Sequence, residues 1–421
     1  MNVMSNRPRR SSVSPSNISK RRHKPDYWLI IFPSALLVVG LIVVYSISPG
    51  LAAQKGVTEN YYASKQLIAV LLGITSFIIA SQIPIQKWKN YRRTLIILSV
   101  VASLAVLLFG DKVNGAYRWI QIGGFSFQAV ELIKFTILIW LASFLYDRWQ
   151  NGEINNSNKT LKPLLLLLLI VTLVVANPKI QSDLGSTGVI VAMMAGMSFV
   201  ACLPFKRIML IALIVITGTT ILVASSSYRR DRLQTFIQPQ RDCQNTGYQS
   251  CQALIAVGSG GLFGKGLAHS VQAYGYLPEA ANDSIFAIYA EKFGFIGVSV
   301  IMIAFAVFFT RIKYVIERAP DVYTRLIAAG VLAWLSTQAI INIGAMIGLL
   351  PLKGITLPFI SYGGTSIIFV MAAIGIVFNI SRYTTYTANT DLEKIEGKKI
   401  EGSTDRRRDR RTYYATTSRR T

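Results

Sequence analysis

The chain alternates long apolar stretches with short polar ones. Ten of the apolar stretches are each close to the roughly 20 residues that an α-helix needs to cross a bilayer. Runs of this length cannot be divided into soluble domains, so the sequence predicts an all-α, polytopic integral membrane protein with ten transmembrane helices. The expected spans lie at about 27–47, 64–83, 94–109, 127–146, 162–177, 184–203, 208–226, 284–310, 323–350 and 363–381.

Two basic tails flank this membrane domain. Residues 1–26 are polar and basic, and they lack the apolar core of a cleaved signal peptide. Residues 383–421 are also basic. The sequence therefore predicts an N-terminal tail at 1–26, a ten-helix membrane domain at 27–382 with a large outward loop at 227–283, and a C-terminal tail at 383–421. An even number of spans places both tails on one side of the membrane.

Charge decides which side that is. The chain is 52% hydrophobic with a mean hydropathy of +0.43, yet it carries 44 Lys and Arg and a net charge of +24. Most of these cations fall in segments that a ten-helix arrangement with an internal N-terminus places in the cytoplasm, as the positive-inside rule requires. The charge then serves mainly to attract anionic membrane lipids. Nucleic-acid binding by Arg406–Arg411 is the less favoured interpretation, and we expect no nucleic-acid partner.

Cysteine and histidine set few limits on function. Cys202 falls in an apolar span, where we expect inert packing, whereas Cys243 and Cys251 share the outward loop. An oxidising compartment would let those two pair, and pairing and free thiols are equally compatible with the sequence. Zinc-ligand spacing is absent and only two His are present, so we expect no structural metal site.

The fourth span carries a charged pair. Glu131 and Lys134 stand three residues apart, on one face of the expected helix. Ionisable groups at bilayer depth are costly and normally face a partner or a cavity. The pair is therefore either an internally neutralised pair or part of the lining of a substrate cavity, and the sequence favours neither.

The outward loops hold further cations and a glycine-rich stretch. Arg229 and Arg230 stand where the positive-inside rule depletes cations, which indicates either an anionic headgroup or pyrophosphate as partner, or a simple helix-end anchor. The stretch GSGGLFGKGL fails as a phosphate-binding loop, because it has Ser259 where that motif needs Gly and Gly266 where it needs Ser or Thr. We expect its glycines to allow tight turns and close backbone approach.

Carboxylates precede the eighth span in the stretch LPEAANDSIF. Glu279 and Asp283 are expected at the outer surface, and Glu291 follows Asp283 by about two helical turns. Because Asp is a favoured N-cap residue, Asp283 taken alone is more readily interpreted as a helix cap than as a functional group.

Together these stretches resemble a known family. The motifs are NGAYRWI, QAVELIK, QSDLGST, YRRDRL, GYQSCQALIAVGSGGLFGKG, YLPEAANDSIFA and NIGAMIGLLPLKGITLPFISYGGTS. They are similar to the successive signatures of the SEDS proteins, the group of FtsW, RodA and SpoVE, from about Tyr27 to Arg382. Asn114 and the motifs YLPEA and LKGITLPFISYGG resemble the division-type members more than the elongation-type ones.

The chain departs from the family pattern near the expected site. The usual HTDF is replaced here by Ala281, Asn282, Asp283 and Ser284, so that only the aspartate is unchanged. Ala129 and Val130 replace the usual Pro and Ser before Glu131, and Lys292 stands where a second Glu is common. These exchanges alter the surroundings of the site rather than its central aspartate.

The resemblance implies a glycosyltransferase that polymerises lipid II into peptidoglycan glycan strands for septal wall synthesis. A pyrophosphate leaving group makes one base sufficient, and we assign it to Asp283. The alternative role for Asp283 is to hold a divalent cation such as Mg²⁺ or Mn²⁺ against the pyrophosphate. We expect no other cofactor. Expected partners are lipid II, membrane lipids, a class B penicillin-binding protein and other division proteins, at the septum of a bacterial inner membrane. The expected substrate-binding residues are Arg118, Glu131, Lys134, Arg229, Arg230, Glu279 and Lys353.

Three alternatives remain open from sequence. A lipid II flippase would use the same cavity and cations without a base at the surface. A division scaffold would tolerate loss of Asp283, and an elongation-type polymerase would share the chemistry.

Overall fold

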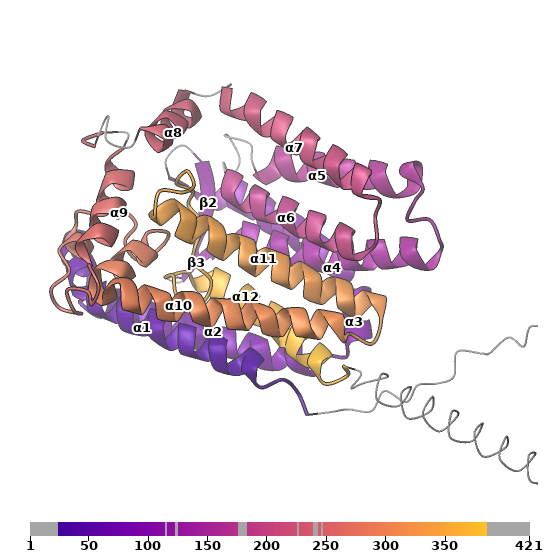
Figure 1. Ribbon diagram of the computed structural model, residues 1–421, viewed down its shortest axis with the longest axis horizontal. Helices are drawn as coiled ribbons and strands as arrows, with labels where there is room; N and C mark the ends of the chain where they lie inside the picture. Colours follow the sequence, from indigo (N-terminus) through magenta and orange to yellow (C-terminus); the bar gives the residue numbers. More distant parts are fainter. Residues whose placement is uncertain are drawn as a thin grey trace, which may run out of the picture.

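The computed structural model describes residues 24–113, 116–122, 125–175, 183–224, 227–238, 243–245 and 247–384 (Figure 1). Predictions for Asn114, for Arg406–Arg411 and for most of both tails lie outside these residues.

Helices dominate the described part of the chain, and ten of them coincide with the predicted spans. They are α1 (Trp28–Lys55), α2 (Tyr61–Gln82), α3 (Ile85–Phe109), α4 (Ala129–Gln150), α5 (Lys162–Val175), α6 (Leu184–Val200), α7 (Phe205–Ala224), α10 (Ile285–Glu317), α11 (Val322–Met346) and α12 (Gly364–Ser381). Eight helical segments of the described chain are long and apolar enough to cross a membrane, and α6 is a shorter apolar helix. The shorter helical segments are η1 (Ser157–Leu161), α8 (Ser227–Ile237), α9 (Tyr248–Ser259) and η3 (Gln272–Tyr274).

The expectation of an all-α fold is wrong in one place. The segment between α3 and α4 forms a small antiparallel sheet in the order β1-β2-β3, with β1 at Asp111–Val113, β2 at Ala116–Ile122 and β3 at Phe125–Gln128. Aromatic and β-branched residues, which favour strands, are frequent in this segment. Strand β3 leads directly into α4, and the backbone N–H of Gln128 donates to the Thr365 hydroxyl (3.2 Å). The sheet is thereby tied to the start of α12.

Burial separates an inner set of helices from an outer one. Helices α4, α11 and α12 are mostly buried, whereas α3 exposes most of its apolar residues, as a lipid-facing helix does. The packing of α2 on α12 is close, because a Cβ at Gly375 would lie 2.6 Å from the Phe77 carbonyl oxygen. The inner helices carry the polar residues described below.

The two described ends of the chain meet at one end of the bundle. The backbone N–H of Asp26, before α1, donates to the Ser381 hydroxyl at the end of α12 (3.1 Å). Arg311, near the end of α10, pairs with the Asp26 carboxylate (2.6 Å). In Figure 1, α9 and the loop before α10 gather at the opposite end of the long helices. This arrangement fits an even number of membrane crossings.

The cysteines correct one expectation and decide a question that the sequence left open. Cys202 does not pack inside a helix: it is exposed in the turn after α6, because the helix ends at Val200. Cys243 and Cys251 form a disulfide that joins the segment before α9 to the first turn of that helix.

The ten-span topology with cytoplasmic termini stays a prediction that tags can test. A reporter after Thr421 and one after Met1 should both report the cytoplasm, and one near Asn245 should report the outer face. We expect this because the basic turns and both described ends lie together, away from the loop before α10. An outward C-terminus would contradict the topology and would place Asp283 on the wrong side.

Candidate active site

The candidate site lies around the first turns of α10, between its start at Ile285 and an interruption of the helix. Helix α10 is interrupted at Gly294, which has φ 63° and ψ −165°. The glycine-rich segment 260–266 lies against this break: the N–H of Lys265 donates to the Glu291 carbonyl (2.9 Å), and the N–H of Phe295 donates to the Gly261 carbonyl (2.8 Å). A Cβ at Gly264 would lie 2.2 Å from the Lys292 carbonyl oxygen. The expectation that these glycines allow close backbone approach is confirmed.

Glu291 anchors the rest of this loop. Its side chain is fully buried, and it accepts hydrogen bonds from the Ser270 hydroxyl (2.5 Å) and the Val271 N–H (3.1 Å), besides an ion pair with Lys265 (3.1 Å). The neighbouring Lys292 donates to the Leu267 carbonyl. Both oxygens of Glu291 are engaged by the loop, so this carboxylate has a structural task and is poorly placed to accept a substrate proton.

Asp283 lies where α10, α11 and the loop before α12 meet. Its backbone carbonyl accepts a hydrogen bond from the Asn342 side chain (2.7 Å), which also donates to the Ile355 carbonyl (2.7 Å). A Cβ at Gly354 would lie 3.7 Å from Oδ2 of Asp283. The structure therefore brings the half-buried Asp283 carboxylate beside the loop that carries Lys353.

The helix-cap interpretation of Asp283 does not match the boundaries of α10. Its N-cap residue is Ser284, whose hydroxyl donates to the Pro278 carbonyl (2.9 Å). Glu279 lies in the same turn, exposed, with φ 52°, and accepts a hydrogen bond from the Asn282 side chain. Asp283 and Glu279 thus stand on one tight turn, with Glu279 on its solvent side.

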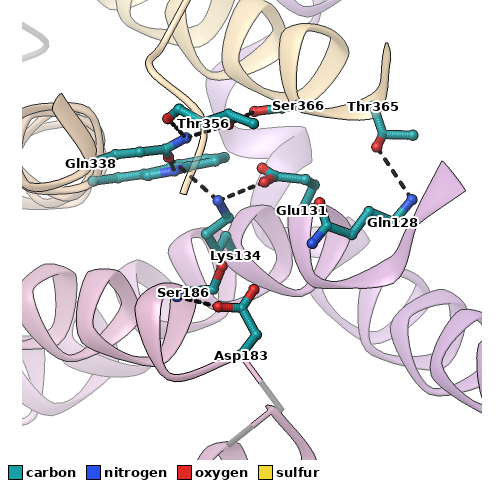
Figure 2. A network of polar contacts seen from close by, with 10 residues as sticks. Gln128, Glu131, Lys134, Asp183, Ser186, Gln338, Thr356, Thr365 and Ser366 are labelled. Carbon is teal, nitrogen blue, oxygen red and sulfur yellow. Dashed lines mark hydrogen bonds and ion pairs between the residues drawn. The ribbon is translucent and has the colours of Figure 1, made fainter. Parts of the chain in front are cut away.

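Glu131 and Lys134 form a buried ion pair (Figure 2). Their side chains are 4% and 1% exposed, and Lys134 Nζ lies 2.8 Å from Glu131 Oε1. Lys134 also donates to Gln338 Oε1 (3.4 Å), which accepts from the Trp334 indole (2.8 Å). Of the two alternatives that the sequence left open, the structure shows the internally neutralised pair, within a larger network on α4 and α11.

The network and Asp283 are linked through consecutive residues of one loop. Gln338 donates to the Thr356 carbonyl (2.9 Å), and Asn342, one turn further along α11, donates to the Ile355 carbonyl. Neither amide was expected as a site residue. Two amides one helical turn apart in an apolar span are the signal that could have identified them, since polar groups at bilayer depth seek partners.

Asp183 belongs to the QSDLGST motif but is not among the expected site residues. Its side chain is buried and caps α6 by accepting from the Ser186 N–H (2.9 Å). A Cβ at Gly185 would lie 2.5 Å from the Ile355 side chain, so the start of α6 packs on the same loop. Figure 2 shows Asp183 on the side of Lys134 away from Gln338.

The predicted cations are placed unevenly. Arg118 lies half-buried on β2, and Lys353 lies in the loop beside Asp283. Arg230 is exposed on α8, which follows α7 and stands away from the start of α10 in Figure 1. Arg229 is on the same helix, but its side chain lies outside the described residues. The structure does not bring α8 to Asp283.

A helical bundle in which eight described segments are long and apolar enough to cross a membrane has the architecture of a polytopic membrane protein. Residues 27–386 match the family of FtsW, RodA and SpoVE, described as cell cycle proteins, and the chain belongs to this family.

Relatives and solved structures agree with this assignment. The chain is 39% identical to the probable peptidoglycan glycosyltransferase FtsW of Coxiella burnetii over 85% of this chain and 96% of the relative. It is 35% identical to the stage V sporulation protein E of Bacillus subtilis over 88% and 100%. At 24% identity, Thermus thermophilus RodA (TM-score 0.62, 86% of this chain and 98% of that one) and a chain of a peptidoglycan synthase complex (0.68, 85% and 98%) share the fold.

Replacement of Gly264 by Ala should loosen the loop on α10. The site combines φ +81° with a carbonyl 2.2 Å from the new Cβ, and such strain costs on the order of 1–3 kcal/mol. Thermal unfolding in detergent should therefore shift downward. The matched control is Gly258→Ala on α9, where nothing lies within 4 Å of an added Cβ. Equal melting temperatures for the two variants would contradict the close approach.

Replacement of Lys134 by Met should destabilise the bundle because it leaves Glu131 buried and unpaired. Breaking a buried pair in this way costs about 3–5 kcal/mol. The double variant Glu131→Gln with Lys134→Met removes both charges and should recover most of the loss. Thermal unfolding of the parent, Lys134→Met and the double variant measures these differences. A Lys134→Met variant as stable as the parent would show that the pair is not desolvated.

Proposed function

We propose that this protein is a peptidoglycan glycosyltransferase that polymerises lipid II for septal wall synthesis. The observation that carries the proposal is Asp283, a half-buried carboxylate beside the Lys353 loop, at the end of the bundle opposite the basic turns. The similarity to the probable peptidoglycan glycosyltransferase FtsW of Coxiella burnetii supports it.

The reaction needs one base. The 4-hydroxyl of a lipid II GlcNAc attacks the anomeric carbon of the growing strand's MurNAc, and the bond to undecaprenyl pyrophosphate breaks with inversion. The hydroxyl proton passes to the base, and the pyrophosphate leaves with the bonding electrons. Pyrophosphate is already a weak base, so the second carboxylate that acts as acid in glycoside hydrolysis is dispensable. Cationic stabilisation of the leaving group contributes more.

We assign the base to Asp283 and the cationic stabilisation of the leaving group to Lys353, whose neighbour Gly354 lies beside the Asp283 carboxylate. No group of three or more His, Cys, Asp or Glu side chains gathers at one point within the described part of the chain. A divalent cation at Asp283 would therefore need further oxygen ligands, which the pyrophosphate of the substrate could supply. Mg²⁺ or Mn²⁺ held there would neutralise charge on the leaving group.

The Glu131–Lys134 network supports the site through the loop. Gln338 and Asn342 fix the carbonyls of Thr356 and Ile355, and thereby the segment beside Asp283. Positioning of this kind is how a preorganised site reduces the cost of reaching the transition state. Glu131 and Lys134 act here as positioning residues rather than as direct contacts of the substrate.

Assembly and location follow from the same proposal. We propose ten membrane crossings with cytoplasmic termini in a bacterial inner membrane, at the division septum, and a class B penicillin-binding protein as partner. The likeness in fold to a chain of a peptidoglycan synthase complex supports a partnered enzyme. A flippase or a scaffold would not need Asp283, which makes that residue the discriminating one.

Replacement of Asp283 by Asn should abolish most polymerisation while preserving the fold. Asn keeps the size and the backbone contact with Asn342 but cannot accept the proton, so the rate should fall by roughly 10²- to 10⁴-fold. The assay is polymerisation of purified lipid II by the purified protein, with and without its transpeptidase partner. Glu279→Gln, on the solvent side of the same turn, is the matched control and should lose less. A near-parental rate for Asp283→Asn would refute the assignment of the base.

A further inference from the structure

A basic cavity lies between α3 and α4, at the end of the bundle opposite Asp283. Its volume is about 330 Å³, and its charged wall is formed by Arg92, Arg93, Asp147 and Arg148. Helix α3 begins beside the end of α12, because the Asn379 side chain donates to the Ile83 carbonyl (2.7 Å). The cavity is therefore near the end where Asp26 and Ser381 meet, which the topology places at the inner leaflet.

The cavity keeps an excess of positive charge. Asp147 pairs with Lys89 (2.6 Å) and Arg92 (3.0 Å), and Glu153 pairs with Arg148 (2.5 Å) and Lys159. Each acid is thus held by two cations, which leaves one positive charge in each group.

Arg93 adds a further charge. It is exposed and makes no ion pair with any residue of the described chain. The Nε atom of Arg148 is buried and has no hydrogen-bond partner among the described residues. The lowered pKa of Glu153, held down first by Lys159 and then by Arg148, keeps that carboxylate ionised, so its pairing with Arg148 persists at neutral pH.

An apolar wall adjoins these cations. Trp140 and Phe144, one turn apart on α4, stack with ring centroids 5.2 Å apart and planes within 4°, and Ile96 lines the same cavity. The Arg148 guanidinium lies 5.3 Å from the Phe144 ring. Trp side chains gather at membrane interfaces, where headgroups begin. A cation cluster beside an apolar wall at this depth suits an amphiphile with an anionic head.

We infer that this cavity binds the headgroup of an anionic phospholipid from the inner leaflet. Arg93 and Arg148 would hold the phosphate, and Ile96, Trp140 and Phe144 would contact the first part of the acyl chains. Basic pockets between transmembrane helices on the cytoplasmic side bind anionic headgroups in this way. A cavity of about 330 Å³ is at the small end of ligand sites and cannot enclose a disaccharide pentapeptide. The inference rests on the topology and not on the proposed reaction.

Lipid retention tests the site directly. The protein is placed in nanodiscs of equal phosphatidylglycerol and phosphatidylcholine, released, and examined by native mass spectrometry for the lipids that stay bound. The parent should retain phosphatidylglycerol in preference to phosphatidylcholine. Arg93→Gln should lower this preference about fivefold, the ratio that corresponds to the loss of one cation near a membrane surface. Arg93→Lys should keep part of it, because it keeps the charge but loses the planar fork.

Lys87→Gln is the matched control. Lys87 is an exposed cation in the first turn of the same helix and does not line the cavity. Retention should match the parent in Lys87→Gln. An equal loss in both variants would show diffuse surface attraction and would overturn the site, as would no loss in Arg93→Gln.

A second experiment tests whether a polyprenyl pyrophosphate, rather than a phospholipid, occupies the cavity. Undecaprenyl pyrophosphate added to the nanodiscs should not displace the retained phosphatidylglycerol at equal mole fraction. Selective displacement that depends on Arg93 would overturn the phospholipid assignment in favour of a polyprenyl pyrophosphate. Parental polymerisation by Arg93→Gln, with lowered lipid retention, would keep the outcome separate from that of the proposed function.

Discussion

Irregular backbone inside a membrane bundle must find hydrogen-bond partners within the protein, and the site described here depends on that constraint. The loop between α11 and α12 is non-helical and largely buried from Ile355 onward. Gln338 and Asn342 provide partners for two consecutive carbonyls of that loop, and Asn342 holds the carbonyl of Asp283 with the same side chain. The same Asn342 side chain therefore both satisfies the loop backbone and positions Asp283.

The same constraint shapes the break in α10. Where the helix loses its own hydrogen bonds at Gly294, the segment 260–266 supplies replacements to both sides of the break. Such an exchange requires the two backbones to approach more closely than a side chain would allow, which explains the glycines better than a ligand does. Glu291 then secures the far end of the segment from a buried position. The glycine-rich segment and the Glu291 carboxylate together hold in place the part of α10 between Asp283 and Gly294.

Local features of the site could be predicted from sequence, and long-range ones could not. Three-residue spacing on one helix made the Glu131–Lys134 pair one of two interpretations, and two cysteines in one loop made the disulfide one of two outcomes. The approach of Gly354 to Asp283 joins segments far apart in the chain, and no periodicity encodes it. The sheet was missed because two of its three strands have only three and four residues and all three lie between apolar spans. Arg229 and Arg230 on α8 were expected at the site because they are cations. Charge alone does not specify where a short helix packs, and α8 stands away from the start of α10.

Burial divides the acidic groups of the protein by task. Glu131 and Glu291 are almost fully buried, each with a lysine partner, and a carboxylate so held is costly to uncouple from its partner during a reaction cycle. Asp283 is only half-buried, and its backbone rather than its carboxylate makes the contact with Asn342. A group fixed through its main chain can hold its position while its side chain gains and loses a proton. This distinction supports the proposed assignment of the base to Asp283 rather than to Glu131 or Glu291.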